Sequence, residues 1–201
     1  MRPDNKFFSF MSLVGDIILL NVLFIITSLP VVTAGVSLTA LYASLKKRIH
    51  GHESYASKDY FKYWKENARN GLIIWCILLP LLIAMLVFTA YIANNLENLA
   101  AVCAYFLLFL ILLFILTYVF PLQATFINSP LKILLNSLLT ALSHLPYTLA
   151  LIFITSIPVC LTLYFPRAFY FTCAYWLLLG FSINTIISVV ITGKVLKHYN
   201  A

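Results

Sequence analysis

The chain has 201 residues and a formal net charge of +7, with 63% hydrophobic and only 9% charged residues. An average soluble domain is roughly 45–50% apolar and about 25% charged, so this composition excludes an ordinary water-soluble fold. The basic residues lie beside the ends of apolar segments and form no recognition motif, which argues against a nucleic-acid partner. Apolar stretches such as 71–91 and 99–119 exceed the roughly 18 residues that mark a spanning helix, and they predict an all-α, polytopic transmembrane helical bundle.

We expect six membrane segments, at about 8–29, 31–45, 71–94, 99–127, 133–164 and 169–192. The first segment carries no small-residue cleavage site, so we expect it to be retained as a helix. Pro30 separates the first two segments because proline lacks a backbone donor and disfavours a helical residue before it. The second segment would span only about 22 Å, less than the roughly 30 Å hydrocarbon core, so a tilted, re-entrant or bilayer-thinning element is an alternative to a full crossing.

The distribution of Lys and Arg predicts the orientation, because short cytoplasmic loops hold the excess of basic residues. With six crossings and both termini in the cytoplasm, Arg167 is the only Lys or Arg outside. Reading Pro30 as a kink in one long helix would move Arg2 and Lys6 outside as well. The six-segment arrangement is therefore favoured, in a single domain spanning residues 1–201.

Strongly polar groups inside the bilayer are expensive, so each predicts either a partner or a function. Asp16 would be a proton or cation site, or a carboxylate paired with Lys6 or a nearby hydroxyl. Asn21 and Asn184 would contact a solute, or bond and pack between helices. His144 would relay protons or donate to a carbonyl that Pro146 leaves free. Together with the broken backbone around Pro30 and Thr33, these residues form a candidate midplane polar site: Asp16, Asn21, Pro30, Thr33, His144 and Asn184.

The longest predicted cytoplasmic region contains a candidate amphipathic helix at about 54–70. Its basic residues recur at helical spacing on one face, and aromatic residues including Tyr60 line another. This pattern is typical of an interfacial helix that binds anionic lipid, or of a face that docks a partner; an ordinary loop helix with internal ion pairs is the alternative. The candidate lipid or partner face comprises Lys58, Phe61, Lys62, Trp64, Lys65 and Arg69.

A more specific string occupies the first seventy residues: Asp16, Asn21, Ser28-Leu29-Pro30, Thr33, Gly35, Ala40-Leu41-Tyr42, Gly51, Phe61 and Lys65-Glu66-Asn67. It resembles the YesL-like family of bacterial integral membrane proteins, a domain of unknown function. The resemblance implies a multi-pass protein of the bacterial plasma membrane, and a gene context of carbohydrate utilisation and sugar import. It implies no biochemical activity.

Catalytic motifs are absent from the sequence: there is no G-x-S-x-G, H-E-x-x-H or P-loop. Four cysteines lie in apolar stretches without a CxxC pair, so we expect them to pack and not to bind metal. We therefore expect no enzyme and no cofactor. Two hypotheses remain: an auxiliary protein that binds membrane lipids and a partner such as a sugar-import permease, or a small-solute or ion transporter or channel. A continuous midplane polar cavity would favour transport.

Overall fold

The computed structural model describes residues 6–51, 54–94, 97–164 and 169–196, and every regular element in these ranges is helical. The all-α prediction is confirmed. The elements are α1 (Lys6–Ser28), the 3₁₀ turn η1 (Val31–Thr33), α2 (Ala34–Ile49), α3 (Ala56–Asn94), α4 (Leu99–Thr125), α5 (Pro130–Ser143), α6 (Leu145–Tyr164), α7 (Phe169–Tyr175), the π-helical turn η3 (Trp176–Gly180) and α8 (Phe181–Leu196).

Within the described residues, five helical stretches are long and apolar enough to cross a membrane, in α1, α3, α4, α6 and the continuous run from α7 to α8. The protein is therefore a multi-pass membrane protein by the length and composition of its helices. The predicted count of six segments is not confirmed. The second segment is the 16-residue α2, and the fifth is divided at His144 into α5, of 14 residues, and α6.

Helix α2 is the central element of the molecule and contacts α1, α3, α4 and α8. Its sequence is rich in small residues, which let neighbouring helix backbones approach closely. Gly35, Val36, Ser37 and every residue from 39 to 45 are buried. This short segment is therefore enclosed by neighbouring helices.

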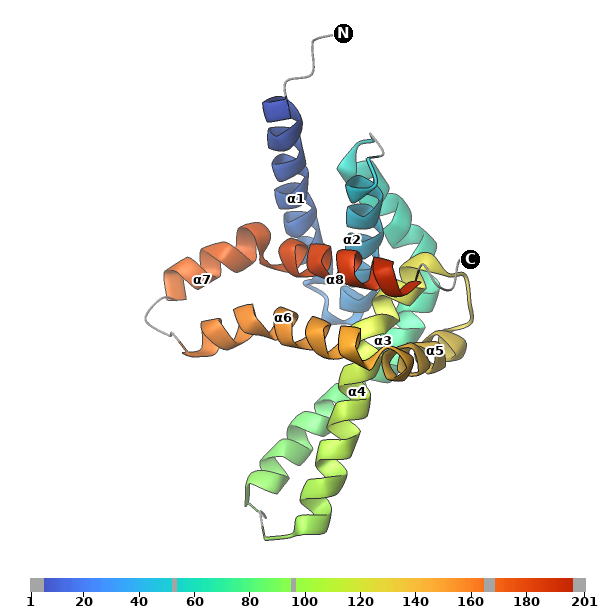
Figure 1. Ribbon diagram of the computed structural model, residues 1–201, viewed down its shortest axis with the longest axis vertical. Helices are drawn as coiled ribbons and strands as arrows, with labels where there is room; N and C mark the ends of the chain where they lie inside the picture. Colours follow the sequence, from blue (N-terminus) through green and yellow to red (C-terminus); the bar gives the residue numbers. More distant parts are fainter. Residues whose placement is uncertain (1–5, 52–53, 95–96, 165–168, 197–201) are drawn as a thin grey trace.

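Two helical hairpins diverge from this centre (Figure 1). One consists of the second half of α3 and the first half of α4 and extends downward in the view. The other consists of α6 and α7 and extends to the left, and α8 then passes back beside α2. Helix α3 runs unbroken for 39 residues, so the segment predicted as a separate loop helix at 54–70 is the beginning of the third helix.

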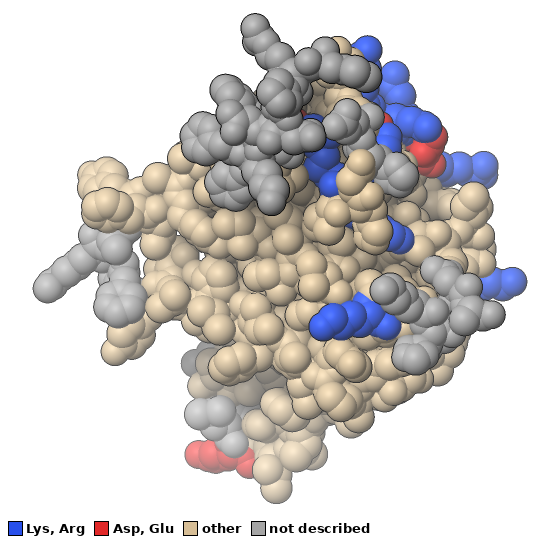
Figure 2. Space-filling view, turned by 45° about the horizontal axis from the view of Figure 1, so that its top comes forward, with Lys and Arg blue, Asp and Glu red and all other residues tan. Residues whose placement is uncertain are grey.

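Two groups of buried side chains hold the helices together. The larger joins α3, α4, α5 and α8 and includes Ile74, Leu78, Tyr118, Val119, Ile133 and Val195. The smaller joins α1, α2 and the beginning of α3 and includes Leu20, Phe24, Leu41, Leu45 and Tyr60. Basic side chains gather near the junction of α2 and α3, toward one side of the molecule, and acidic atoms appear at the opposite tip (Figure 2).

Candidate functional site

Asp16 lies on α1 and forms an ion pair with Arg48 in the last turn of α2. The two side chains are 18% and 19% exposed, respectively, so the pair is largely shielded. The partner differs from the predicted Lys6 because α2 returns antiparallel beside the start of α1, bringing together residues 32 positions apart. The charge of Asp16 is compensated within the protein.

Asn21 is fully buried and binds the backbone of the π-helical turn η3. Its Nδ2 donates to the carbonyls of Trp176 and Leu177, at 3.0 and 2.8 Å, and its Oδ1 accepts from the Ser182 amide at 3.0 Å. A π-helical turn interrupts the i to i−4 hydrogen-bond ladder, and the asparagine amide supplies the missing partners. Asn21 therefore joins α1 to the last helix, as the packing alternative predicted.

The break at Pro30 is closed by hydrogen bonds. The Thr33 hydroxyl lies 2.6 Å from the Thr27 carbonyl and 2.8 Å from the Pro30 carbonyl, and the Trp75 indole donates to the Val31 carbonyl at 2.6 Å. Carbonyls released where α1 ends thus regain donors, as backbone at membrane depth requires. Pro30 and Thr33 therefore lie at a helix junction whose carbonyls accept hydrogen bonds from side chains.

His144 ends α5, and α6 begins at the next residue. Pro146, the second residue of α6, cannot donate a backbone hydrogen bond into the preceding turn, which explains the break. Thr148 links the two helices, since its hydroxyl lies 2.9 Å from the Ala141 carbonyl and 3.0 Å from that of His144. His144 therefore lies at the junction between α5 and α6.

Asn184 lines a crevice of about 400 Å³ between α2, α4, α6 and α8. Hydroxyl side chains also line it, including Thr117, Thr155 and Thr185, each bonded to its own helix backbone. The Asn184 Oδ1 is buried and has no hydrogen-bond partner among the described residues. It is the polar atom of this crevice that a bound donor would satisfy.

The structure does not bring the six predicted midplane residues into one cavity. Asn184 alone among them lines the crevice, while Asp16, Asn21 and Thr33 are engaged by the contacts above. Sequence reasoning missed Gln123 of α4, which is buried, accepts from the Thr39 hydroxyl at 3.1 Å and donates to the Asn67 carbonyl at 3.4 Å. The signal was available, because an amide is conspicuous within the apolar stretch 99–127.

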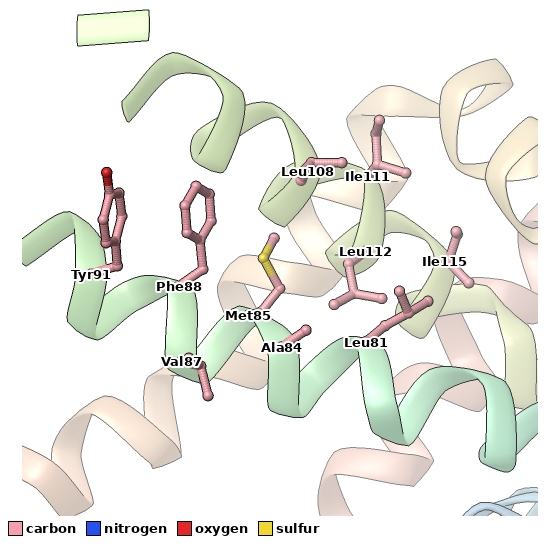
Figure 3. Close-up of a pocket in the computed structure, with 10 residues that line it drawn as sticks. All are labelled: Leu81, Ala84, Met85, Val87, Phe88, Tyr91, Leu108, Ile111, Leu112 and Ile115. Carbon is pink, nitrogen blue, oxygen red and sulfur yellow. The ribbon is translucent and has the colours of Figure 1, made fainter. Parts of the chain in front are cut away.

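A larger groove lies between the diverging parts of α3 and α4 and has a volume of about 770 Å³. Figure 3 shows Met85 and Phe88 pointing from α3 toward the side of the groove where Leu108 of α4 lies. The other lining residues are Leu81, Ala84, Val87, Tyr91, Ile111 and Ile115. Because hydrocarbon forms nearly all of this lining, the groove suits apolar contacts such as lipid chains.

The predicted basic face lies on the first four turns of α3. Lys58, Lys62, Lys65 and Arg69 are all exposed. Within the described residues, Lys62 forms an ion pair with Glu66 at 4.0 Å. The predicted aromatic face is divided: Phe61 is 44% exposed, whereas Tyr60 is buried and its hydroxyl lies 2.6 Å from that of Thr27. Trp64 packs partly buried against the same cluster of α1 and α2. The aromatic side of α3 therefore serves mainly to bind the protein core, which leaves the cations facing outward.

No group of three or more His, Cys, Asp or Glu residues suited to a metal ion occurs among the described residues. Cys76, Cys103, Cys160 and Cys173 are free thiols on exposed surfaces of the helices. In a membrane protein these surfaces are the ones that face lipid.

A sequence-family model described as "Protein of unknown function, DUF624" matches residues 17–91 of the chain. The match covers α1 from Ile17, all of α2 and most of α3, including Asn21, Pro30 and the basic face. Comparison with curated proteins and with solved structures found no match for the chain. The chain is thus similar to an uncharacterised family over its N-terminal part.

Proposed function

We propose that the protein is a non-catalytic accessory component of a membrane complex, which docks an acidic cytoplasmic segment of a partner onto the basic face of α3. The observation that carries the proposal is the exposure of Lys58, Lys62, Lys65 and Arg69 on one helix face with little internal charge compensation. Such a face attracts and orients a partner of opposite charge. The resemblance to YesL-like proteins makes a sugar-import permease of the bacterial plasma membrane the partner of choice.

The polar interior supports this role over transport. Asn21, Thr33 and Asp16 are used in structural hydrogen bonds or ion pairs, and the groove of about 770 Å³ between α3 and α4 is apolar. A solute pathway needs polar groups that remain available along its length. In the crevice between α2, α4, α6 and α8, the buried Asn184 Oδ1 is such a group.

Affinity purification from native membranes tests the docking face. The triple variant Lys58→Glu, Lys62→Glu and Lys65→Glu is expected to lose one specific partner that the unmodified chain and a Lys132→Glu control both retain. Lys132 is an exposed lysine on α5 and is not part of the basic face of α3. Equal recovery of every partner by the triple variant would contradict the proposal.

Transport remains the second candidate because the Asn184 amide oxygen is unsatisfied. It is tested with the purified chain in liposomes. Uptake of a sugar or ion that disappears in Asn184→Ala would replace the accessory role with a transport role, whereas no uptake above empty liposomes is the expected result.

A further inference from the structure

A small pocket of about 310 Å³ lies at the C-terminal end of α2, between α2 and neighbouring parts of α3 and α4. It is lined by Ala43, Lys46, Lys47, His50, Tyr63 and Ala124. Two lysines, a histidine and a tyrosine thus converge on a space large enough for a phosphate group and too small for a whole lipid. The pocket lies on the predicted cytoplasmic side and outside the five candidate spans, apart from the two residues that α3 and α4 contribute.

Lys46 carries the uncompensated charge of this pocket. Lys47 pairs with Asp59 at 2.7 Å and the adjacent Arg48 pairs with Asp16. Within the described residues, no carboxylate lies within ion-pair distance of Lys46, and its Nζ donates to the Thr125 hydroxyl at 3.0 Å. Burial lowers the pKa of the Lys46 ammonium, as expected for a cation that has lost water without gaining an anion.

Lys46 lies in the last turn of α2, where the helix dipole favours cations. Its own carbonyl accepts from the His50 amide at 3.3 Å and lies 2.7 Å from His50 Nδ1. Within the described residues, the Lys46 ammonium donates to the Thr125 hydroxyl at the end of α4. The dipole favours the cation at this position but supplies no anion.

The loop after α2 fixes the remaining groups. Gly51 adopts a φ of +78°, the left-handed conformation that glycine favours at helix ends, and its amide bonds to the Arg48 carbonyl. Because a carbonyl can only accept, His50 Nδ1 carries the proton of its contact with Lys46. In the neutral imidazole, Nε2 then accepts from a P–OH group, and in the imidazolium it donates to a phosphate oxygen. The imidazole is thereby held beside the lysines.

We propose that this pocket binds a phosphate group, with Lys46 as the principal cation, Lys47 as the second, and His50 and Tyr63 as hydrogen-bonding groups. Phosphate oxygens accept charge-assisted hydrogen bonds from ammonium groups, and a phosphate would supply the anion that Lys46 lacks. Two sources offer this chemistry: the headgroup of an anionic phospholipid at the membrane surface and a soluble phosphate compound. The site is independent of the partner proposed for α3.

Protection of Lys46 from acetylation tests the proposal on the unmodified full chain, purified in maltoside micelles that contain no phosphate. Inorganic phosphate and phosphatidic acid are added separately, and modified lysines are quantified by mass spectrometry. Either ligand is expected to slow acetylation of Lys46 while leaving the exposed Lys65 unchanged. Protection by inorganic phosphate identifies a site open to soluble phosphates, and protection by phosphatidic acid alone identifies a lipid headgroup site.

Direct binding of the protecting ligand provides the second measurement. Lys46→Met is expected to weaken binding about tenfold, equivalent to ~1.4 kcal/mol. Lys46→Arg keeps the charge and should retain binding. Lys65→Met alters a cation outside the pocket and should also retain binding. Absence of protection with both ligands, or equal loss in Lys46→Met and Lys65→Met, would overturn the proposal. Because the protection experiment uses the unmodified chain, misfolding of a variant does not affect it.

Discussion

Asn21 and Asn184 are the same residue type at membrane depth, yet their surroundings differ. Asn21 satisfies three backbone groups of the η3 region, whereas Asn184 Oδ1 is buried without a partner among the described residues. Removing one member of a buried hydrogen bond leaves the other member unsatisfied. Removing a group that has no partner leaves no other polar group unsatisfied. The two asparagines should therefore respond in opposite ways to an apolar replacement.

We expect Asn21→Leu to lower the free energy of unfolding by about 1–3 kcal/mol, because the Trp176 and Leu177 carbonyls and the Ser182 amide lose their partner. Asn184→Leu, the matched control, should leave stability unchanged within about 0.5 kcal/mol or raise it. Equilibrium unfolding in mixed detergent micelles measures both variants. Equal destabilisation by the two replacements would show that the η3 contacts do not carry the role assigned to Asn21.

At the level of the helices, the tight crossing of α2 and α3 depends on two glycines. A Cβ atom on Gly35 would lie 2.8 Å from Trp75 Cβ, and one on Gly71 would lie 2.9 Å from Val36 Cγ2. Real Cβ contacts at such distances force a neighbour to move. The absence of side chains at these two positions lets α2 occupy the centre of the molecule.

Gly35→Ala and Gly71→Ala are each expected to destabilise the protein by about 1–3 kcal/mol, the usual consequence of overpacking. Gly15→Ala provides the control, since a Cβ there would have no contact within 4 Å and alanine is the better helix former. The three variants are compared by heating each in detergent. The folded protein that remains is measured as the area of its monodisperse chromatographic peak. A Gly15→Ala variant as unstable as the other two would contradict the crossing argument.

Breaks in the helices were predictable where proline causes them locally. Pro30 separates α1 from α2 as expected, and Pro146 could have indicated the division at His144 that the segment 133–164 concealed. The π-helical turn η3 was not predictable, because its partner Asn21 is about 155 positions away in sequence. Asn184 was recognised as a costly polar residue, but its crevice depends on how α4, α6 and α8 diverge, which periodicity does not encode.

For the molecule as a whole, the distribution of charge connects the fold with its orientation. Seven basic residues lie in the last turn of α2 and the first four turns of α3: Lys46, Lys47, Arg48, Lys58, Lys62, Lys65 and Arg69. The predicted external turns are 95–98 and 165–168, and residues 95–96 and 165–168, with Arg167, fall outside the described ranges. Because moving these cations through hydrocarbon is expensive, the basic end should remain cytoplasmic.

Thiol labelling in cells tests this orientation. In a chain with its four cysteines replaced, Glu97→Cys at the α3–α4 tip should react with a membrane-impermeant maleimide in intact cells, since Glu97 is exposed beyond the spans. Lys58→Cys and Lys194→Cys should react only after permeabilisation, because α3 begins and α8 ends on the basic side. Labelling of Lys58→Cys and Glu97→Cys from the same side would require α3 to enter and leave one face of the membrane. That result is incompatible with its unbroken 39-residue helix, whose length of about 58 Å exceeds the hydrocarbon core.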